Sequence, residues 1–246
     1  MSDAKTYWRD PALGEPRDLD TPAGRLRIFD AGSGPPIVFV HGLLVNANLW
    51  RKVVPRLAPD FRCVSLDMPL GSHELTMPDA DLKPIGLANL IADSIEAAGL
   101  EDVTLVGNDT GGGLSQLVVT QRPERIGRLV LTSCDAYDNF PPRFFQIVLA
   151  PALIPGAARF VFAPLRLRRM RELPIAFGWL MHSELEQDAG DSYVLPALTS
   201  GAVADDVRRA MRGIHRRFTV AAAERFGEFN RPVLIAWSRD DRFFPP

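Results

Sequence analysis

Short apolar runs separated by turn residues recur along the first half of the chain. Within these runs apolar side chains follow one another almost without a break, which is typical of strands buried on both faces of a sheet. The runs lie at residues 36–40, 62–67, 103–106 and 129–133. Residues 25–29 alternate between polar and apolar positions instead, which predicts a half-buried strand near a sheet edge. The residues before about Thr21 are polar and predict no strand.

Apolar residues at helical spacing lie between these runs. They predict helices at residues 46–57 and 84–100, and a third helix that carries Leu114, Leu117 and Val118 on one face. Strands and helices therefore alternate, which predicts an α/β fold in which helices flank a mostly parallel sheet. The chain has 246 residues, 46% of them hydrophobic, and this size suits one α/β domain with an insertion.

The alternation stops before the last strand. Between about residues 140 and 228 the apolar residues are broken by prolines and form no strand pattern, and the sheet resumes only at residues 232–237. We predict that short helices form a lid here, because an insertion between parallel strands projects from the strand ends and roofs the cleft where open α/β sheets bind ligands. The predicted division is a first core part at 1–137, the helical lid at 138–228 and a second core part at 229–246.

The segment at residues 103–113 joins a buried strand to a helix through a glycine-rich turn, with Asp109 at its centre. Small residues beside Asp109, at Gly107 and Gly111, fit a sharp strand-to-helix turn. Backbone N–H groups at the helix N-terminus would keep the Asp109 carboxylate ionised and nucleophilic, so that it can attack a saturated carbon and form an ester. The alternative interpretation is an ordinary turn in which Asp109 only caps the helix.

Other polar groups follow predicted strands in the same way. His41 comes directly after a buried strand and is either a structural histidine or a proton-transfer group. Gly42 lets the backbone approach a ligand, so the N–H of Leu43 could point into a cleft. Asp135 follows another strand and is expected at the same rim, whereas His73 is expected in an exposed loop.

Composition excludes several classes of protein. The net charge is −2, and Lys and Arg are scattered except in Arg166–Arg171, which we interpret as a solvated helix face with an anionic-ligand site as the alternative. We therefore expect no nucleic-acid partner. Cys63 and Cys134 lie in or beside predicted buried strands, so no disulfide is expected. The chain shows no apolar leader and no apolar run of about 18 residues, which predicts a cytoplasmic protein without a membrane partner.

Taken together, these segments resemble the α/β-hydrolase superfamily. The resemblance rests on His41-Gly42-Leu43, the elbow around Asp109, the segment 123–125, the helical insertion, and the segment 237–245 with Asp241. Aspartate at the elbow is similar to the haloalkane dehalogenase and epoxide hydrolase branch. The resemblance implies a mostly parallel sheet with a helical lid inserted before the penultimate strand.

The same resemblance implies roles for particular residues. In that branch the elbow aspartate attacks carbon, and a histidine oriented by an acid activates the water that hydrolyses the ester. Carried over, Asp109 is the nucleophile and Asp241 the acid. The N–H groups of Leu43 and Thr110 form the oxyanion hole. Asp135 is the alternative acid, because some relatives place the acid after that strand.

The chain departs from the branch at three places. Thr110 stands where dehalogenases usually carry a tryptophan that holds the leaving halide. Epoxide hydrolases usually use two lid tyrosines, and this lid offers Tyr193, with Tyr137 at its entrance and Trp179 as a further candidate. The family's histidine lies after one further strand beyond the acid, whereas the sequence ends at Pro246.

We therefore expect the last strand, its helix and the catalytic histidine to be missing from these residues. His182 and His215, both in the predicted lid and in the wrong chain order, are considered as substitutes. Without a further strand, residues 233–237 would form an apolar sheet edge that is unpaired on one side.

The preferred hypothesis is hydrolysis through an aspartyl ester of a small, largely apolar substrate with an electrophilic carbon, a haloalkane or an epoxide. One alternative is a hydrolase of the same fold that acts on another substrate class. A second alternative is a catalytically inactive hydrolase scaffold that binds a small apolar ligand beneath the lid. No cofactor or metal is expected, and the oligomeric state stays open.

Overall fold

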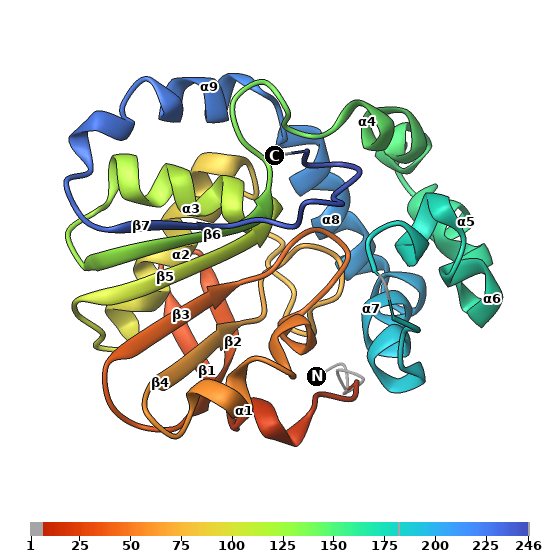
Figure 1. Cartoon of the computed structure of the whole chain (residues 1–246). Helices are drawn as coiled ribbons and strands as arrows, with labels where there is room; N and C mark the ends of the chain where they lie inside the picture. Colours follow the sequence, from red (N-terminus) through yellow and green to blue (C-terminus); the bar gives the residue numbers. More distant parts are fainter. Residues whose placement is uncertain (1–6, 182, 246) are drawn as a thin grey trace.

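The computed structural model describes residues 7–181 and 183–245. Its centre is a seven-stranded sheet in the order β1-β2-β4-β3-β5-β6-β7 (Figure 1). The strands are β1 Glu15–Thr21, β2 Gly24–Ala31, β3 Pro36–Val40, β4 Arg62–Leu66, β5 Val103–Asp109, β6 Ile126–Cys134 and β7 Val233–Ala236. The pairs β1–β2 and β2–β4 are antiparallel, and the strands from β4 to β7 in the sheet run parallel. The predicted α/β fold with a mostly parallel sheet is confirmed.

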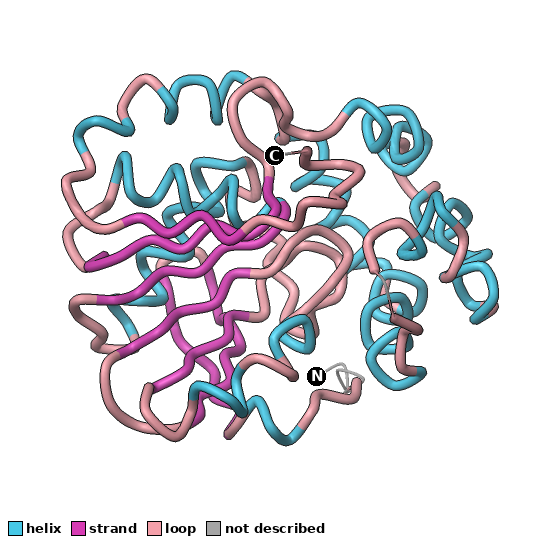
Figure 2. Tube along the Cα trace, in the orientation of Figure 1, coloured by secondary structure: helices cyan, strands magenta, loops and turns pink. Residues whose placement is uncertain are grey.

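Helices pack on both faces of this sheet (Figure 2). One face is covered by α2 Pro84–Ala97, α3 Thr110–Gln121 and α9 Arg217–Ala223, and the other by α1 Val54–Leu57 and the short helix Ala47–Trp50. Successive side chains of β3 point to opposite faces of the sheet and pack against different helix layers, because side chains alternate along a strand. Val38 packs into the α2 and α3 layer, whereas the ring centroid of Phe39 lies 5.0 Å from that of Trp50.

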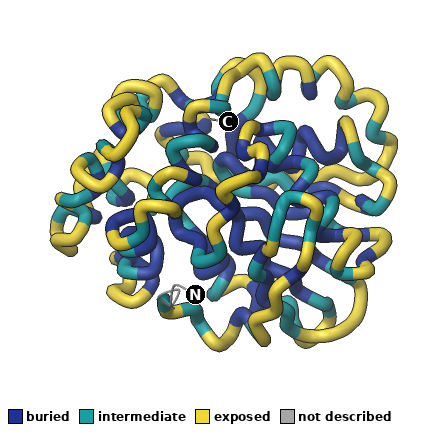
Figure 3. The backbone as a smooth tube through the Cα atoms, turned by 180° about the vertical axis from the view of Figure 1, so that it is seen from behind, coloured by how far each residue is buried: buried dark blue, intermediate teal, exposed yellow. Residues whose placement is uncertain are grey.

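The segment between β6 and β7 is helical up to α9. It contains α4 Arg143–Leu149, α5 Ala158–Phe162, α6 Arg168–Arg171, α7 Gln187–Thr199 and α8 Gly201–Gly213. Figure 1 shows these helices beyond the carboxyl ends of the parallel strands. Their buried residues form a separate cluster that includes Phe162, Phe177 and Val207, so this segment has a small core of its own. In Figure 3 the outer helices of the segment are largely exposed, whereas the central strands of the sheet, such as β3 and β4, are buried.

Three local predictions were wrong. Residues before Thr21 form β1, which pairs with β2 although only Leu19 of its side chains is buried, so the apolar signal is weak. Residues 46–57 do not form one helix: the Asn46 side chain accepts the N–H of Asn48 and starts a short 3₁₀ turn, and α1 begins only at Val54. His73 is buried rather than exposed.

Two other features bear on the sequence predictions. β7 is the edge of the sheet within the described part of the chain, and its apolar side chains are exposed, as expected. Among the described residues, no helix is both long enough and apolar enough to cross a membrane.

Candidate active site

Asp109 occupies the turn between β5 and α3. Its backbone has φ +53° and ψ −131°, a left-handed conformation that is rare for a residue with a side chain and is found mostly at functional sites. Helix α3 then passes close to the end of β3. A Cβ at Gly111 would collide with the backbone carbonyl oxygens of Val40 and His41, so only glycine fits there. The predicted strand-to-helix elbow is therefore present.

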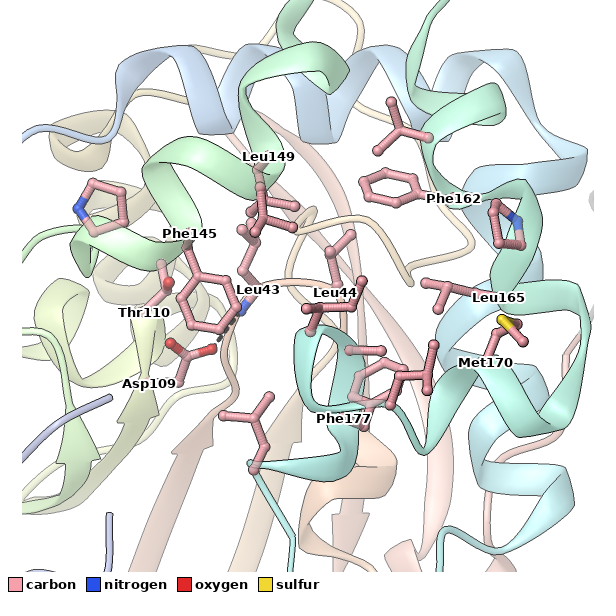
Figure 4. Close-up of a pocket in the computed structure, with 18 of the residues that line it drawn as sticks. Leu43, Leu44, Asp109, Thr110, Phe145, Leu149, Phe162, Leu165, Met170 and Phe177 are labelled. Atoms are coloured by element: carbon pink, nitrogen blue, oxygen red, sulfur yellow. Dashed lines mark hydrogen bonds between the residues drawn. The ribbon is translucent and has the colours of Figure 1, made fainter. Parts of the chain in front are cut away.

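The backbone N–H of Leu43 points at this carboxylate. It donates a hydrogen bond of 3.1 Å to Asp109 Oδ2 (Figure 4). The loop after β3 can come this close because Gly42 has no side chain, and a Cβ at that position would collide with the Asp109 carboxylate. Asp109, Leu43 and Thr110 were expected to converge, and the structure brings them together at the wall of one cavity.

The charge state of Asp109 differs from the expectation. Burial raises the pKa of Asp109 to about 7, although hydrogen bonds from the N–H groups of Leu43 and Thr110 act to lower it, and the charge of Asp241 raises it further. The helix N-terminus thus stabilises the carboxylate less than burial destabilises it. Asp109 therefore holds its proton to a much higher pH than an exposed aspartate does.

The cavity beside Asp109 is almost wholly apolar. It has a volume of about 250 Å³, and Asp109 and Thr110 are the polar residues of its wall. Figure 4 shows the aromatic and aliphatic side chains that enclose the remainder. They come mostly from the helical segment and include Phe145, Leu149, Phe162, Leu165, Met170 and Phe177. The sequence marked this segment as rich in apolar residues, but it could not show which of them face the cavity.

A second cavity of about 360 Å³ also reaches Asp109 and carries more polar groups. Asp241 lines this cavity, so the two carboxylates share it. Asp241 Oδ1 accepts the N–H groups of Phe243 and Phe244, at 2.9 and 2.8 Å, which holds the carboxylate in place. Asp241 therefore lies at the same rim as Asp109, as the sequence predicted.

Asp135 is placed differently. It is buried below the elbow, where its Oδ2 accepts the Thr110 hydroxyl at 3.2 Å and its N–H donates to the carbonyl oxygen of Asp109 at 3.3 Å. Its other carboxylate oxygen has no hydrogen-bond partner within the described residues. Burial and the neighbouring Asp109 charge raise the pKa of Asp135 well above its ordinary value. Asp135 is not among the residues that line the two cavities at Asp109.

Comparison with known proteins places the chain in a family. The model of the alpha/beta hydrolase fold family matches residues 35–246. The chain belongs to the α/β-hydrolase family. Among curated proteins, an uncharacterized protein of Mycobacterium tuberculosis is 36% identical to this chain over 121 residues, which cover 49% of this chain and 35% of that protein.

Two further comparisons concern dehalogenases and solved structures. Haloalkane dehalogenase 2 of M. tuberculosis is 34% identical over 125 residues, which cover 50% of this chain and 43% of that protein. The matched part of the chain thus spans less than half the length of these curated relatives. A solved α/β-hydrolase-fold protein of Burkholderia ambifaria superposes with a TM-score of 0.77 at 22% identity, over 93% of this chain and 82% of that chain. At this identity the superposition shows the fold alone.

The described histidines do not line either cavity at Asp109. His41 is buried, its Nε2 accepts the N–H of Met68 at 2.9 Å, and its Nδ1 lies 2.8 Å from the carbonyl oxygen of Gly42. Desolvation lowers the pKa of His41 to about 4, so the ring is neutral and holds the loop that presents Leu43. His215 lies on a third cavity, which Asp109 does not line. His182 lies outside the described residues.

Two other residues that the sequence suggested for the site, Tyr193 and Trp179, line the second, more polar cavity. Tyr193 is buried there, with its ring centroid 6.0 Å from that of Phe177, and Trp179 lies in the same wall, half-exposed. Burial raises the pKa of Tyr193 to about 12, so its hydroxyl keeps its proton. Neither residue lines the apolar cavity. Tyr137 lies outside both cavities.

Proposed function

We propose that this α/β-hydrolase cleaves small apolar substrates with an electrophilic carbon, a haloalkane or an epoxide, through an ester on Asp109. One observation carries the proposal: the Asp109 carboxylate is held by the N–H of Leu43 at the wall of an apolar cavity. The haloalkane dehalogenases among its relatives support the substrate class.

The geometry suits a two-step reaction. In the first step the Asp109 oxygen that Leu43 does not hold attacks the substrate carbon. The C–O bond forms as the carbon–halogen bond breaks, and the halide leaves with the electron pair. With an epoxide, the ring C–O bond breaks and its oxygen takes up a proton from water. In the second step water attacks Cγ of the ester. The negative charge then develops on Oδ2, where the N–H groups of Leu43 and Thr110 can stabilise it. The intermediate collapses as the Cγ–O bond to the substrate breaks, the departing oxygen takes up the proton that the water lost, and the alcohol leaves, which restores the carboxyl group of Asp109.

Asp241 fits the part of the acid in this scheme better than Asp135 does. A group that orients and stabilises a proton-accepting base must face the space beside the nucleophile. Asp241 shares a cavity with Asp109, whereas Asp135 is buried beneath the elbow and engaged by Thr110. We therefore propose Asp241 as the acid.

The main alternative is a hydrolase scaffold that binds an apolar ligand without chemistry. One observation favours this alternative. The Thr110 hydroxyl donates its hydrogen bond to Asp135, so it does not donate to a leaving group in the cavity. Two observations oppose this alternative, the strained backbone of Asp109 and the hydrogen bond from the Leu43 N–H to its carboxylate. A protein that only binds an apolar ligand requires neither feature.

The test is covalent labelling of Asp109. The purified chain is mixed with 1-bromohexane or styrene oxide in ¹⁸O-water and quenched in acid over a time series, and peptides are mapped by mass. We expect an alkyl adduct on Asp109, or ¹⁸O in its carboxylate once the ester hydrolyses, because water attacks Cγ. The labelling rate should rise as the pH increases through about 7, since only the ionised form attacks.

Asp109→Asn should abolish both signals, and Asp138→Asn, an exposed carboxylate outside both cavities, should leave them unchanged. Absence of adduct, label and product with both probes, in a chain whose fold is intact by circular dichroism, would support the scaffold instead. Product release that persists in Asp109→Asn would exclude the ester mechanism while keeping a hydrolase.

A further inference from the structure

The charge of this protein is unevenly distributed. Residues 140–181, which we call the cap segment, contain six arginines, one glutamate and neither lysine nor aspartate, a net charge of +5. The whole chain carries −2, so the remainder carries −7. Five of the arginines are exposed, and they are Arg143, Arg159, Arg166, Arg168 and Arg169. A cationic segment on an otherwise acidic protein indicates an anionic partner.

Large apolar side chains are exposed on the same segment. Five of them are between 57% and 76% exposed, and they are Ile147, Ile154, Phe160, Leu167 and Ile175. Single exposed apolar residues are ordinary, but a gathering of them indicates an interaction surface. In Figure 3 the outer helices of this segment are mostly exposed along their length.

The two kinds of side chain are adjacent. In α5, Ala158 and Phe162 are buried toward the protein, and the residues between them on the outer side are Arg159 and Phe160, with the guanidinium carbon 4.7 Å from the ring centroid. Leu167 is likewise flanked in sequence by exposed arginines on both sides. Apolar side chains bordered by arginines are what a lipid interface accepts, because the apolar groups enter the acyl boundary and the guanidinium groups reach the headgroups.

Most of these arginines are not neutralised by the protein. Two of the six arginines form ion pairs. The distance from Arg168 Nη2 to Glu184 Oε1 is 3.3 Å, and that from Nη2 of the buried Arg171 to Asp191 Oδ1 is 2.6 Å. By contrast, Arg159, Arg166 and Arg169 make no ion pair with any residue that the structure describes. Their charge is therefore available to an external anion.

We infer that the outer face of the cap segment docks on the surface of an anionic lipid bilayer. No membrane partner was expected from the sequence because no apolar run could span a bilayer, but a protein that lies on the bilayer surface needs only exposed apolar and cationic groups. The same helices line the apolar cavity with their inner faces, through residues such as Phe162 and Leu165. Docking would thus bring the wall of the cavity to the lipid, and it does not depend on the chemistry proposed for Asp109.

The test measures binding to vesicles of phosphatidylcholine, with and without phosphatidylglycerol, by flotation and by titration. We expect the 246-residue chain to bind the anionic vesicles, more weakly as salt rises, and to bind pure phosphatidylcholine far less. Replacement of Arg159, Arg166 and Arg169 by Gln should weaken binding roughly 100-fold, since each cation near an anionic surface contributes about fivefold. Phe160→Ser combined with Leu167→Ser should weaken it about tenfold or more.

Matched changes elsewhere provide the controls. Arg17, Arg25 and Arg56 are exposed outside the cap segment, and their joint replacement by Gln removes the same charge. Binding should then stay within about twofold of the original, and circular dichroism should show every variant folded. Failure of the chain to bind anionic vesicles, equal loss in the two triple variants, or binding that does not require phosphatidylglycerol would each overturn the proposal. So would self-association that the cap variants abolish without any vesicle binding.

Discussion

Asp109 shows how one residue is governed by opposing effects. Burial favours its neutral form, the N–H groups of Leu43 and Thr110 favour the carboxylate, and the resulting pKa is about 7 against an ordinary value of 3.8. Between these two values the folded state keeps a proton that the unfolded state has released. The contribution of this group to stability therefore falls as the pH rises from about 4 to about 7.

Asp109→Asn should for this reason stabilise the protein at pH 8, by at most about 4 kcal/mol, because a pKa difference of one unit corresponds to about 1.4 kcal/mol. The gain should become small at about pH 3, below both pKa values, where both states carry the proton. Urea unfolding at the two pH values measures it, with Asp138→Asn as the exposed control. A gain that is equal at both pH values would contradict the raised pKa.

Gly42 is a second position at which a single atom matters. A Cβ there would collide with the Asp109 carboxylate, so Gly42→Ala should displace the carboxylate from the Leu43 N–H. We expect adduct formation to slow roughly 100-fold, the effect of misplacing a reacting group by about 1 Å. Gly227→Ala is the control, because a Cβ there meets nothing within 4 Å. The measurement is the rate of Asp109 labelling in the two variants. An unchanged rate in Gly42→Ala would show that the loop can move aside.

At the scale of elements, α8 is tied to the loop after β4 by a buried polar cluster. Asp206 of α8 lies 3.1 Å from Nε2 of His73 and accepts the N–H of Met77 at 2.9 Å and a guanidinium N–H of Arg209 at 2.6 Å. Burial alone would raise the pKa of Asp206, but these hydrogen bonds outweigh it and lower the pKa. The cluster therefore contributes stability at neutral pH that is lost as the pH falls through the lowered pKa of Asp206.

Asp206→Asn should destabilise the protein by about 3 kcal/mol, because it removes one partner of a buried charged cluster and leaves the others unmatched. The neighbouring exposed Asp205, which pairs with Arg208 on the surface, provides the control, and Asp205→Asn should change stability by less than about 1 kcal/mol. Urea denaturation at pH 7 compares the two. Similar small losses in both variants would mean that α8 is held by its apolar contacts instead.

At the scale of the whole molecule, β7 is an edge strand of the sheet with exposed apolar side chains. It pairs with β6 on one side only among the described residues, and Val233, Leu234 and Ile235 are about half or more exposed. An exposed apolar edge strand is a template for pairing with another chain.

Leu234→Lys should accordingly reduce self-association of the 246-residue protein, because a lysine on an edge strand disfavours pairing of one edge with another. Sedimentation velocity over a concentration series measures the effect. Val53→Lys places the same charge at a half-exposed apolar position in another part of the fold and should have little influence. If the two variants associate as the original chain does, β7 is not the contact.

Much of the fold followed from local patterns. The strands at residues 36–40 and 103–106 were recognisable because a strand buried on both faces needs continuous apolar residues, and the elbow at Asp109 because a tight turn beside a helix needs glycine. β1 was missed because a strand whose side chains mostly face solvent leaves no such pattern.

The residues themselves thus determined the α/β class and the elbow, since each follows from patterns within a few positions. The approach of Leu43 to Asp109 was expected because the strands that precede them should be neighbours in a parallel sheet, as β3 and β5 are. Only the tertiary structure decided that Asp241 rather than Asp135 shares a cavity with Asp109, and that His73 is buried. Only the structure, too, showed that burial outweighs two hydrogen bonds in setting the pKa of Asp109. It also decided that the arginines and large apolar side chains of the cap segment are exposed. These outcomes depend on distances and burial between segments far apart in the chain, and no local pattern of residues encodes them.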